Sequence, residues 1–392
     1  MDKQCDLKLS GIDSMIRLIS ATILSVLFSS SAIIFSGCKT TSMSSKGSDH
    51  GKEIVLRLEP GPDNPRNSEG DFITLKNGRI LFIYSHFAGA SGGDFGNAYL
   101  ASRYSDDKGK TWSQIDEKVV GQEGDMNVMS VSLLRLQNSE IALFYARKNT
   151  ASDCIPMMRT STDEAKTWSD AIQCITDRKE YFVLNNNRVI QLKNGRLLMP
   201  VSLHISPGGV WGPSSAKGTI YCYLSDDNGR TWRYDREVPN PEDVILQEPG
   251  VIELKSGDIF MFMRTGEGVQ YVSYSKDKGE TWSPASPGNI ISPRSPASIA
   301  RIPSTDDLLL VWNKNGTDQK RTPFNIAVSK DEGKTWDHLK TLEDDPDGWY
   351  CYTAIHFTKK DVLLGHCAGN RAKGTGLAVT QITKLDLDWI YK

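Results

Sequence analysis

Polar and charged residues recur where the apolar, strand-like segments of this sequence begin and end. Counting back nine residues from the turn of each predicted hairpin gives one set of positions: Glu69, Ser130, Asn186, Glu248, Ala297 and Tyr352. Residues directly after the second segment of each hairpin give another set: His86, Arg147, His204, Arg264, Asn313 and His366. Carboxyl groups can transfer protons, and arginine can bind a carboxylate through two parallel hydrogen bonds. Such a gathering of polar side chains is typical of a ligand-binding rim.

Six predicted hairpins place these residues. Each has an apolar segment, a polar turn and a second apolar segment, as in LKNGRILF at residues 75–82. The other five hairpins are centred on residues 134–144, 192–199, 254–261, 301–311 and 357–365. Their strands are nearly continuous in apolar residues, as expected where both faces of a sheet are covered.

An eight-residue box follows each of the first five hairpins. It reads SDDKGKTW from Ser105, and the later copies are STDEAKTW, SDDNGRTW, SKDKGETW and SKDEGKTW, which begin at Ser161, Ser225, Ser275 and Ser329. The Asp can accept backbone N–H bonds in a tight turn, and the Gly can adopt a positive φ. Thr-Trp suits the start of the next strand, with the Trp packed between sheets. We therefore predict that these aspartates are structural and mark the turns of outer hairpins.

Two hairpins per repeat, at a spacing of 50 to 64 residues between boxes, predict an all-β protein. We expect a six-bladed β-propeller of four-stranded antiparallel blades, in one domain over residues 52–392. Residues 53–58 are expected to close the ring against the last blade, whose outer strands include residues 377–382. A linear solenoid is the alternative.

The N-terminal residues have the pattern of an export signal. Lys3, Lys8 and Arg17 precede an apolar run at 18–35, which ends in Phe-Ser-Gly before Cys38. This ending resembles a bacterial lipobox, so we predict a signal peptide over 1–37, lipidation of Cys38 and a flexible tether over 38–51. The protein is then exported and lipid-anchored at a bacterial membrane, at the outer membrane or cell surface, or in the periplasm. A plain signal peptide or a single anchoring helix is the alternative.

Composition narrows the class of partner. The chain has 392 residues, of which 24% are charged and 39% hydrophobic, with net charge −2, so nothing suggests binding to nucleic acid. Five cysteines beyond Cys5 and Cys38 lack the spacing of a disulfide framework or a zinc site, although Cys351 and Cys367 could meet across the last hairpin. We expect a monomer without metal or cofactor.

The boxes resemble the Asp-boxes, or bacterial neuraminidase repeats, of the sialidase superfamily of six-bladed propellers, and the resemblance covers residues 52–392. Glu248 before one strand and Arg264 at the end of the next are similar to a sialidase Glu and a carboxylate-binding Arg. Arg321, in Lys-Arg-Thr-Pro, is similar to the family's last such Arg. The Tyr of Tyr352-Thr-Ala-Ile is similar to the family's nucleophile, with Tyr350 as the alternative register.

The first repeat departs from the family pattern. Where sialidases carry Arg-Ile-Pro, this chain has Ser-Glu-Gly, and Arg66 lies two residues before it. Glu69 and Asp71 could replace the missing Arg or reject a carboxylate. His86 stands in place of a further family Arg, and Asp94, in a glycine-rich loop, occupies the region of the acid/base Asp.

The resemblance implies an exo-α-sialidase-like glycosidase that removes terminal sialic acid from glycoconjugates with retention. Tyr352 would attack, Glu248 would take its proton and Asp94 would act as acid and base. The predicted substrate-binding residues are Arg66, Arg264, Arg321, Glu69, Asp71, His86 and Arg147. The alternatives are a divergent glycosidase or polysaccharide lyase for another acidic sugar, and a non-catalytic glycan-binding surface lipoprotein.

Overall fold

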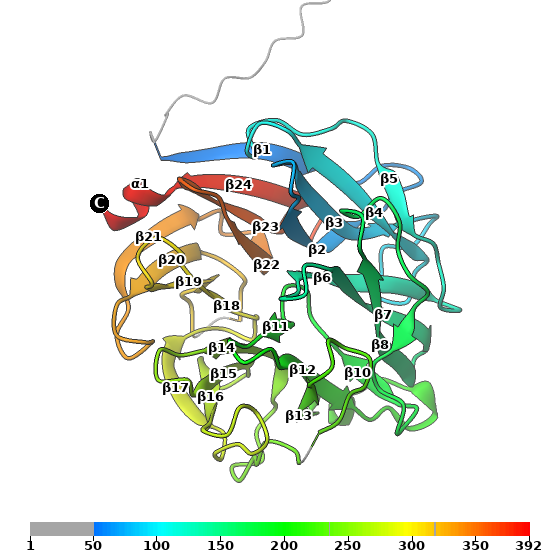
Figure 1. Cartoon of the computed structure of the whole chain (residues 1–392), viewed down its shortest axis with the longest axis vertical. Helices are drawn as coiled ribbons and strands as arrows, with labels where there is room; N and C mark the ends of the chain where they lie inside the picture. The colour runs from blue at the N-terminus through cyan, green and yellow to red at the C-terminus, as the bar shows by residue number, and fades with distance from the viewer. Residues whose placement is uncertain (1–50, 235, 317–318) are drawn as a thin grey trace, which may run out of the picture. The chain divides into compact units, whose positions relative to one another are not determined.

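The computed structural model describes residues 51–234, 236–316 and 319–392. Their strands form radial sheets around a central axis, with β2, β6, β11, β14, β18 and β22 innermost (Figure 1). This arrangement is the six-bladed β-propeller that the repeats predict. The signal peptide, Cys38 and almost all of the tether lie outside the described residues.

Consecutive strands form each blade from the axis outward. The first two blades contain β2 (Asn67–Thr74), β3 (Ile80–Phe87), β4 (Ala98–Ser105) and β5 (Glu117–Val120), then β6 (Asn127–Arg135), β7 (Ile141–Thr150), β8 (Asp153–Ser161) and β9 (Ile172–Gln173). The third contains β10 (Tyr181–Val183), β11 (Ile190–Gln191), β12 (Leu197–His204) and β13 (Gly218–Ser225), with the short 3-10 helices Pro207–Gly209 and Ser214–Ala216 between the last two. Single parallel pairs link the ends of strands in neighbouring blades: Ala98 with Asn127, and Cys154 with Tyr181.

The other three blades are separate antiparallel sheets of four strands. The fourth and fifth contain β14 (Gln247–Glu253), β15 (Ile259–Arg264), β16 (Val269–Ser275) and β17 (Ser286–Ile291), then β18 (Ser298–Arg301), β19 (Leu308–Asn313), β20 (Phe324–Ser329) and β21 (Asp337–Glu343). The sixth contains β22 (Gly348–Phe357), β23 (Asp361–Asn370), β24 (Thr380–Asp386) and β1 (Lys52–Leu58), and the chain ends in the helix α1 (Leu387–Tyr391).

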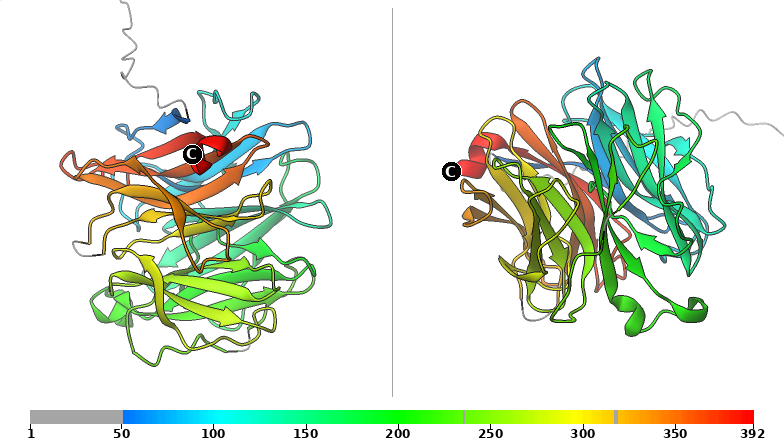
Figure 2. Two further views of the ribbon diagram at one scale, coloured as in Figure 1. Left: turned by 90° about the vertical axis from the view of Figure 1, so that its left-hand side faces the viewer. Right: turned by 60° about the horizontal axis from the view of Figure 1, so that its bottom comes forward.

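The first strand closes the ring. β1 pairs antiparallel with β24, from Lys52 opposite Leu385 to Leu58 opposite Thr380. Both views in Figure 2 show the blue start of the propeller beside its red end. The predicted closure by residues 53–58 is confirmed, and β24 is the strand predicted near 377–382.

The third blade differs from the predicted pattern of four complete strands. Its innermost strand is split into β10 and β11, and its outermost strand is reduced to one bridge, between Leu224 and Arg233. The segment between β10 and β11 leaves the sheet, and its Asn186 side chain forms hydrogen bonds across the channel. Asn186 Nδ2 donates to the carbonyl oxygens of Gly70, at 2.9 Å, and Tyr352, at 3.0 Å.

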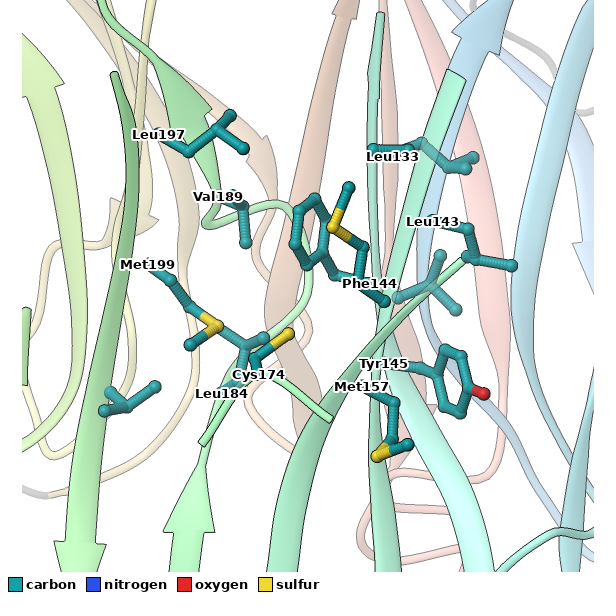
Figure 3. Packing of buried hydrophobic residues seen from close by; sticks show 14 of the residues in the cluster. Leu133, Leu143, Phe144, Tyr145, Met157, Cys174, Leu184, Val189, Leu197 and Met199 are labelled. Carbon is teal, nitrogen blue, oxygen red and sulfur yellow. The ribbon is translucent and has the colours of Figure 1, made fainter. Parts of the chain in front are cut away.

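Apolar side chains fill the space between neighbouring blades. Figure 3 shows Phe144 of the second blade facing Val189 and Met199 of the third, while Tyr145 and Met157 lie on the other face of the second blade. Because the strands are covered on both faces, their sequences are nearly continuous in apolar residues. Within the described residues, no helix combines the length and apolar character needed to span a membrane.

The boxes form the predicted outer turns. In the first, Asp107 Oδ1 accepts the Thr111 N–H at 2.9 Å, and Oδ2 accepts the Thr111 hydroxyl at 2.6 Å. Gly109 has φ of 83°, and its backbone lies so close to Leu363 of the sixth blade that a side chain would collide with it. The second box carries Ala165 instead, which adopts φ of 62° despite its Cβ. Each box thus closes its own hairpin, and the first also packs against the neighbouring blade.

Replacing Asp107 by Ala removes acceptors for Thr111 and for the Lys110 N–H. We expect Asp107→Ala to lower the free energy of unfolding by about 1–3 kcal/mol, since three hydrogen bonds that close the turn are lost. Chemical denaturation measures this loss. The control Lys110→Ala, at an exposed site in the same turn, should change it by less than about 0.5 kcal/mol. Equal effects of the two substitutions would contradict a structural role for the Asp.

Candidate functional site

Five inner strands carry a residue with positive φ at equivalent places. These residues are Glu69 (51°), Ser130 (63°), Asn187 (55°), Glu248 (48°) and Tyr352 (55°). In all but the third blade the strand register shifts there, as in a β-bulge. Such backbone is uncommon for residues other than glycine, and bulges re-aim side chains beside active sites. The nine-residue count locates four of the five residues, and misses the third blade by one position.

One pocket, with a volume of about 310 Å³, lies where these bulges converge. The first, second, fourth and sixth bulges contribute Glu69, Ser130, Glu248 and Tyr352 to its wall. Other polar and aromatic residues in the wall include Asp94, Lys148, Tyr181, Phe182, Asn185, His204, Trp211, Gln247, Arg264 and Arg321.

A hydrogen bond and an ion pair join Tyr352, Glu248 and Arg264 on one side of the pocket. The Tyr352 hydroxyl donates to Glu248 Oε1 at 3.2 Å, and Arg264 Nη1 lies 2.7 Å from Glu248 Oε2. Tyr350, the alternative register, instead packs its ring against Phe324 at 5.7 Å between centroids and does not line this pocket. The bulge therefore selects Tyr352 as the tyrosine that faces the site.

Tyr352 and Glu248 are held in opposite protonation states by their surroundings. Burial raises the pKa of Tyr352 and the Glu248 charge raises it further, against the opposing charges of Arg321 and Arg264. Burial also acts to raise the pKa of Glu248, but those two arginines outweigh it and lower that pKa. The phenol is thus protonated and the carboxylate ionised, which is the arrangement of a nucleophile beside its base.

Arg321 lies beside the tyrosine and is almost completely buried. Its guanidinium carbon is 5.3 Å from the centre of the Tyr352 ring and 4.8 Å from that of Trp349. Nη1 is 2.9 Å from the Cys351 sulfur. Cys351 stands opposite Cys367 across β22 and β23, as the sequence suggests, and both are free thiols.

Arg66 lies behind the pocket wall and is 2% exposed. Its Nη1 donates to Asp94 Oδ1 at 2.6 Å, and its Nη2 donates to Glu69 Oε1 at 3.3 Å. The structure therefore brings Arg264 and Arg321 together on the pocket, whereas Arg66 reaches it only through two carboxylates. Arg66 lines a second, adjacent cavity that shares Asp94 with the first.

The two carboxyl groups bound to Arg66 differ in environment. The Asp94 side chain is 58% exposed; the protein around it disfavours its charge, but Arg66 and Lys148 outweigh this and lower its pKa. Glu69 is 7% exposed and accepts a hydrogen bond from the Ser130 hydroxyl at 3.0 Å. Burial raises the pKa of Glu69 and outweighs the opposing charge of Arg66.

Asp71 faces away from the pocket, so its predicted contact with substrate does not follow. Its Oδ1 accepts from Phe72 N at 2.7 Å and from Asn187 Nδ2 at 2.9 Å, and its Oδ2 accepts from Leu133 N at 2.7 Å. The carboxyl group thus ties together the inner segments of the first three blades. Asp71 is two residues beyond Glu69, but the bulge between them turns the two side chains to different partners.

His86 and Arg147 also lie outside the pocket wall, contrary to prediction. His86 Nδ1 is 3.2 Å from Asp116 Oδ2, and its ring stacks on Tyr99 within its own blade. Arg147 donates to Gln173 at 3.3 Å on the outer side of the second blade. Successive side chains of a strand point to opposite faces, so the pocket receives the next residue, Lys148.

Lys148, Tyr181 and Trp211 are pocket residues that the predicted site omits. Lys148 Nζ donates to the Asp94 carbonyl at 2.7 Å and lies 5.5 Å from the centre of the Tyr181 ring. The Tyr181 and Trp211 rings meet edge to face at 4.7 Å. Strand alternation would have identified Lys148, and Tyr181 lies on an inner strand. Trp211 comes from a loop outside the repeat, so no pattern indicates it.

Histidines near strand ends do not assemble a metal site. His86, His204 and His366 belong to different blades. In the part of the chain that the structure describes, no three His, Cys, Asp or Glu side chains gather closely enough to hold a metal ion.

Fold and repeats together identify the class of protein. The family model for the BNR repeat-like domain matches residues 116–364, and that for the BNR/Asp-box repeat matches residues 103–114. The first match covers more than half of the chain. The protein belongs to this BNR repeat-like family, within the sialidase superfamily.

Characterised relatives are distant. The sialidase of Paraclostridium sordellii is 27% identical over 237 residues, which are 53% of this chain and 55% of that protein. The anhydrosialidase of Macrobdella decora is 28% identical over 272 residues, or 62% and 34% of the two chains. This chain thus spans about half or less of the length of these relatives. The solved Hadza microbial sialidase Hz136 has the same fold, with a TM-score of 0.67, 17% identity and coverage of 82% of this chain and 66% of that one.

Stability should depend on pH through Asp71. Burial raises its pKa to about 7, against hydrogen bonds from Leu133, Phe72 and Asn187 that lower it. The folded state therefore holds a proton that the unfolded state releases near pH 4, so this carboxyl group makes stability fall as pH rises from about 4 to about 7.

We expect Asp71→Asn to reduce that slope and to lower stability at pH 5 by about 1–3 kcal/mol, because the amide cannot accept all three hydrogen bonds. Urea denaturation across pH 4–8 measures both effects. As a control, Asp125→Asn makes the same change of charge at an exposed residue, and it should change neither the pH slope nor the stability at pH 5. A slope equal to that of the wild type in Asp71→Asn would contradict this assignment.

Proposed function

We propose that this protein is a retaining exo-α-sialidase that removes terminal sialic acid from glycoconjugates. The observation that carries the proposal is the Tyr352–Glu248 hydrogen bond in a pocket that also presents Arg264 and Arg321. Membership of the sialidase superfamily supports a glycosidase, and the pocket residues support this form of the reaction.

Sialic acid has a carboxylate on its anomeric carbon, so an anionic carboxylate nucleophile would be repelled. A neutral phenol avoids this repulsion, and sialidases are an exception to the rule of two carboxylates for this reason. In the proposed reaction Tyr352 attacks the anomeric carbon while Glu248 accepts its proton. Arg321, stacked near the phenol ring, offsets the negative charge that develops on the oxygen.

Arg264 and Arg321 would hold the sugar carboxylate, since guanidinium groups bind carboxylates through paired hydrogen bonds. Arg264 already pairs with Glu248, so the incoming carboxylate shares this cation. Arg66 contributes only positive potential from behind the wall.

A second candidate function is cleavage of a different terminal sugar, acidic or neutral. It is favoured by the position of Glu69, whose carboxyl group faces the pocket in the repeat where sialidases carry a carboxylate-binding arginine. We also propose that the protein acts outside the cytoplasm, anchored through a lipid on Cys38. The order of basic, apolar and small residues at the N-terminus supports this.

Turnover of an aryl α-sialoside tests the proposed function. We expect the wild type to release the aglycone with retention, seen by proton NMR of the first sugar product. Tyr352→Phe should lower kcat on the order of 10³-fold or more, because the nucleophile is lost. The matched control is Tyr350→Phe, which removes the same atom outside the pocket and should leave kcat within a few-fold of the wild type.

Failure has two distinguishable forms. Turnover of neutral or uronic-acid aryl glycosides but not of the sialoside would exclude sialic acid and support the second candidate. No turnover of any aryl glycoside by the folded wild type would exclude both candidates.

A further inference from the structure

Two carboxyl groups of the first blade reach the pocket and share one arginine. Arg66 donates to Asp94 through Nη1 and to Glu69 through Nη2. A glycosidase needs one carboxyl group that gives a proton to the leaving oxygen. Sequence resemblance points to Asp94 for this step, but the structure distinguishes the two groups.

Asp94 is arranged as a lasting anion. Its Oδ1 lies 2.6 Å from Arg66 Nη1, and most of its side chain is exposed at the pocket edge. Its backbone carbonyl accepts hydrogen bonds from Lys148 Nζ and Asn127 Nδ2, at 2.7 and 2.9 Å, which hold the loop over the second blade. This close pairing with a buried guanidinium favours the ionised form of Asp94 and lowers its pKa, against the burial that acts to raise it.

Glu69 occupies the same kind of position as Tyr352 and Glu248. It occupies the bulge of the first blade, as Glu248 and Tyr352 occupy those of the fourth and sixth, and all three line the pocket. The Asn186 side chain bridges the carbonyl oxygens of Gly70 and Tyr352, so the bulges of the first and sixth blades are adjacent. Glu69 therefore lines the same pocket as Tyr352 and Glu248 and is almost fully shielded from solvent.

Three charged groups and one hydroxyl act on Glu69. Arg66 and Lys148 lower its pKa and Asp94 raises it, while the Ser130 hydroxyl favours its ionised form. Burial is the largest effect, and the net pKa is raised. The protein thus favours the protonated form of Glu69, whereas it favours the ionised form of Asp94, and Arg66 stabilises the Glu69 carboxylate once its proton has left.

Building on the proposed glycosidase function, we propose that Glu69 is the proton donor to the leaving group and that Asp94 positions Arg66. In the first step a bond forms between the Tyr352 oxygen and the anomeric carbon as the bond to the aglycone oxygen breaks. The aglycone oxygen keeps that electron pair and takes the Glu69 proton, while Glu248 takes the phenol proton. In the second step Glu69 accepts a proton from the attacking water, and the released tyrosine regains its proton from Glu248.

The test compares Glu69→Gln with Asp94→Asn on two glycosides of the accepted sugar. One has a nitrophenyl aglycone, which leaves without a proton, and the other an alkyl or sugar aglycone, which needs one. Glu69→Gln should lower kcat/KM on the order of 10²–10⁴-fold for the poor leaving group. For the nitrophenyl glycoside the loss should be less than about 10-fold, since that aglycone needs no general acid. Added azide should restore its kcat, because azide attacks the glycosyl-tyrosine without a base.

Asp94→Asn should lower kcat/KM by the same factor for both glycosides. Thermal unfolding of both variants confirms that each is folded. The opposite pattern would overturn the proposal. In that pattern Asp94→Asn lowers kcat/KM only for the glycoside with the poor leaving group, and Glu69→Gln lowers it equally for both glycosides. Absence of wild-type turnover on every glycoside would instead sink the proposed function, and this assignment with it.

Ser130→Ala distinguishes a proton-donating role of Glu69 from a purely structural one. It removes a hydrogen bond that favours ionised Glu69, so the alkaline limb of kcat/KM for the poor leaving group should move to higher pH. A purely structural role for Glu69 predicts a lower rate with an unmoved limb, and this result would contradict the proposal.

Discussion

Hydrogen bonds across the central channel hold the inner segments in place, and the pocket depends on them. Asp71 accepts from the backbone of Leu133 in the second blade and from the Asn187 side chain in the third. Asn187 Oδ1 in turn accepts the Ile355 N–H of the sixth blade at 3.3 Å. Because these groups are buried, each lost hydrogen bond would leave an unsatisfied polar atom. The network therefore fixes four blades relative to one another, and the bulges with them.

The bulges direct polar side chains from this rigid framework into the pocket. A regular strand would alternate its side chains between the two faces of the blade, where apolar residues pack. A positive φ interrupts this alternation and directs Glu69, Glu248 and Tyr352 into the channel. Neighbouring blades support the distorted backbone; for example, the Ser130 N–H donates to Ser85 Oγ of the first blade at 3.0 Å.

Three carboxyl groups in one small pocket have different properties because their surroundings differ. Glu248 lies between Arg264 and Arg321 and is kept ionised, whereas burial dominates at Glu69 and favours the neutral acid. Asp94 is exposed but paired with Arg66. Environments that push pKa values apart allow chemically similar groups to take different roles in one reaction.

The sequence by itself determined the six-bladed propeller, the outer turns and the closing strand, because each follows from local patterns repeated along the chain. Constant spacing from the hairpin turn also identified Glu69, Glu248 and Tyr352, since five of the six blades place a residue with positive φ at nearly the same distance. Only the tertiary structure decided which way Arg66 and Asp71 face and that Lys148, not Arg147, enters the pocket. These outcomes depend on partners from other blades and from a loop outside the repeat, which no pattern within one repeat can specify.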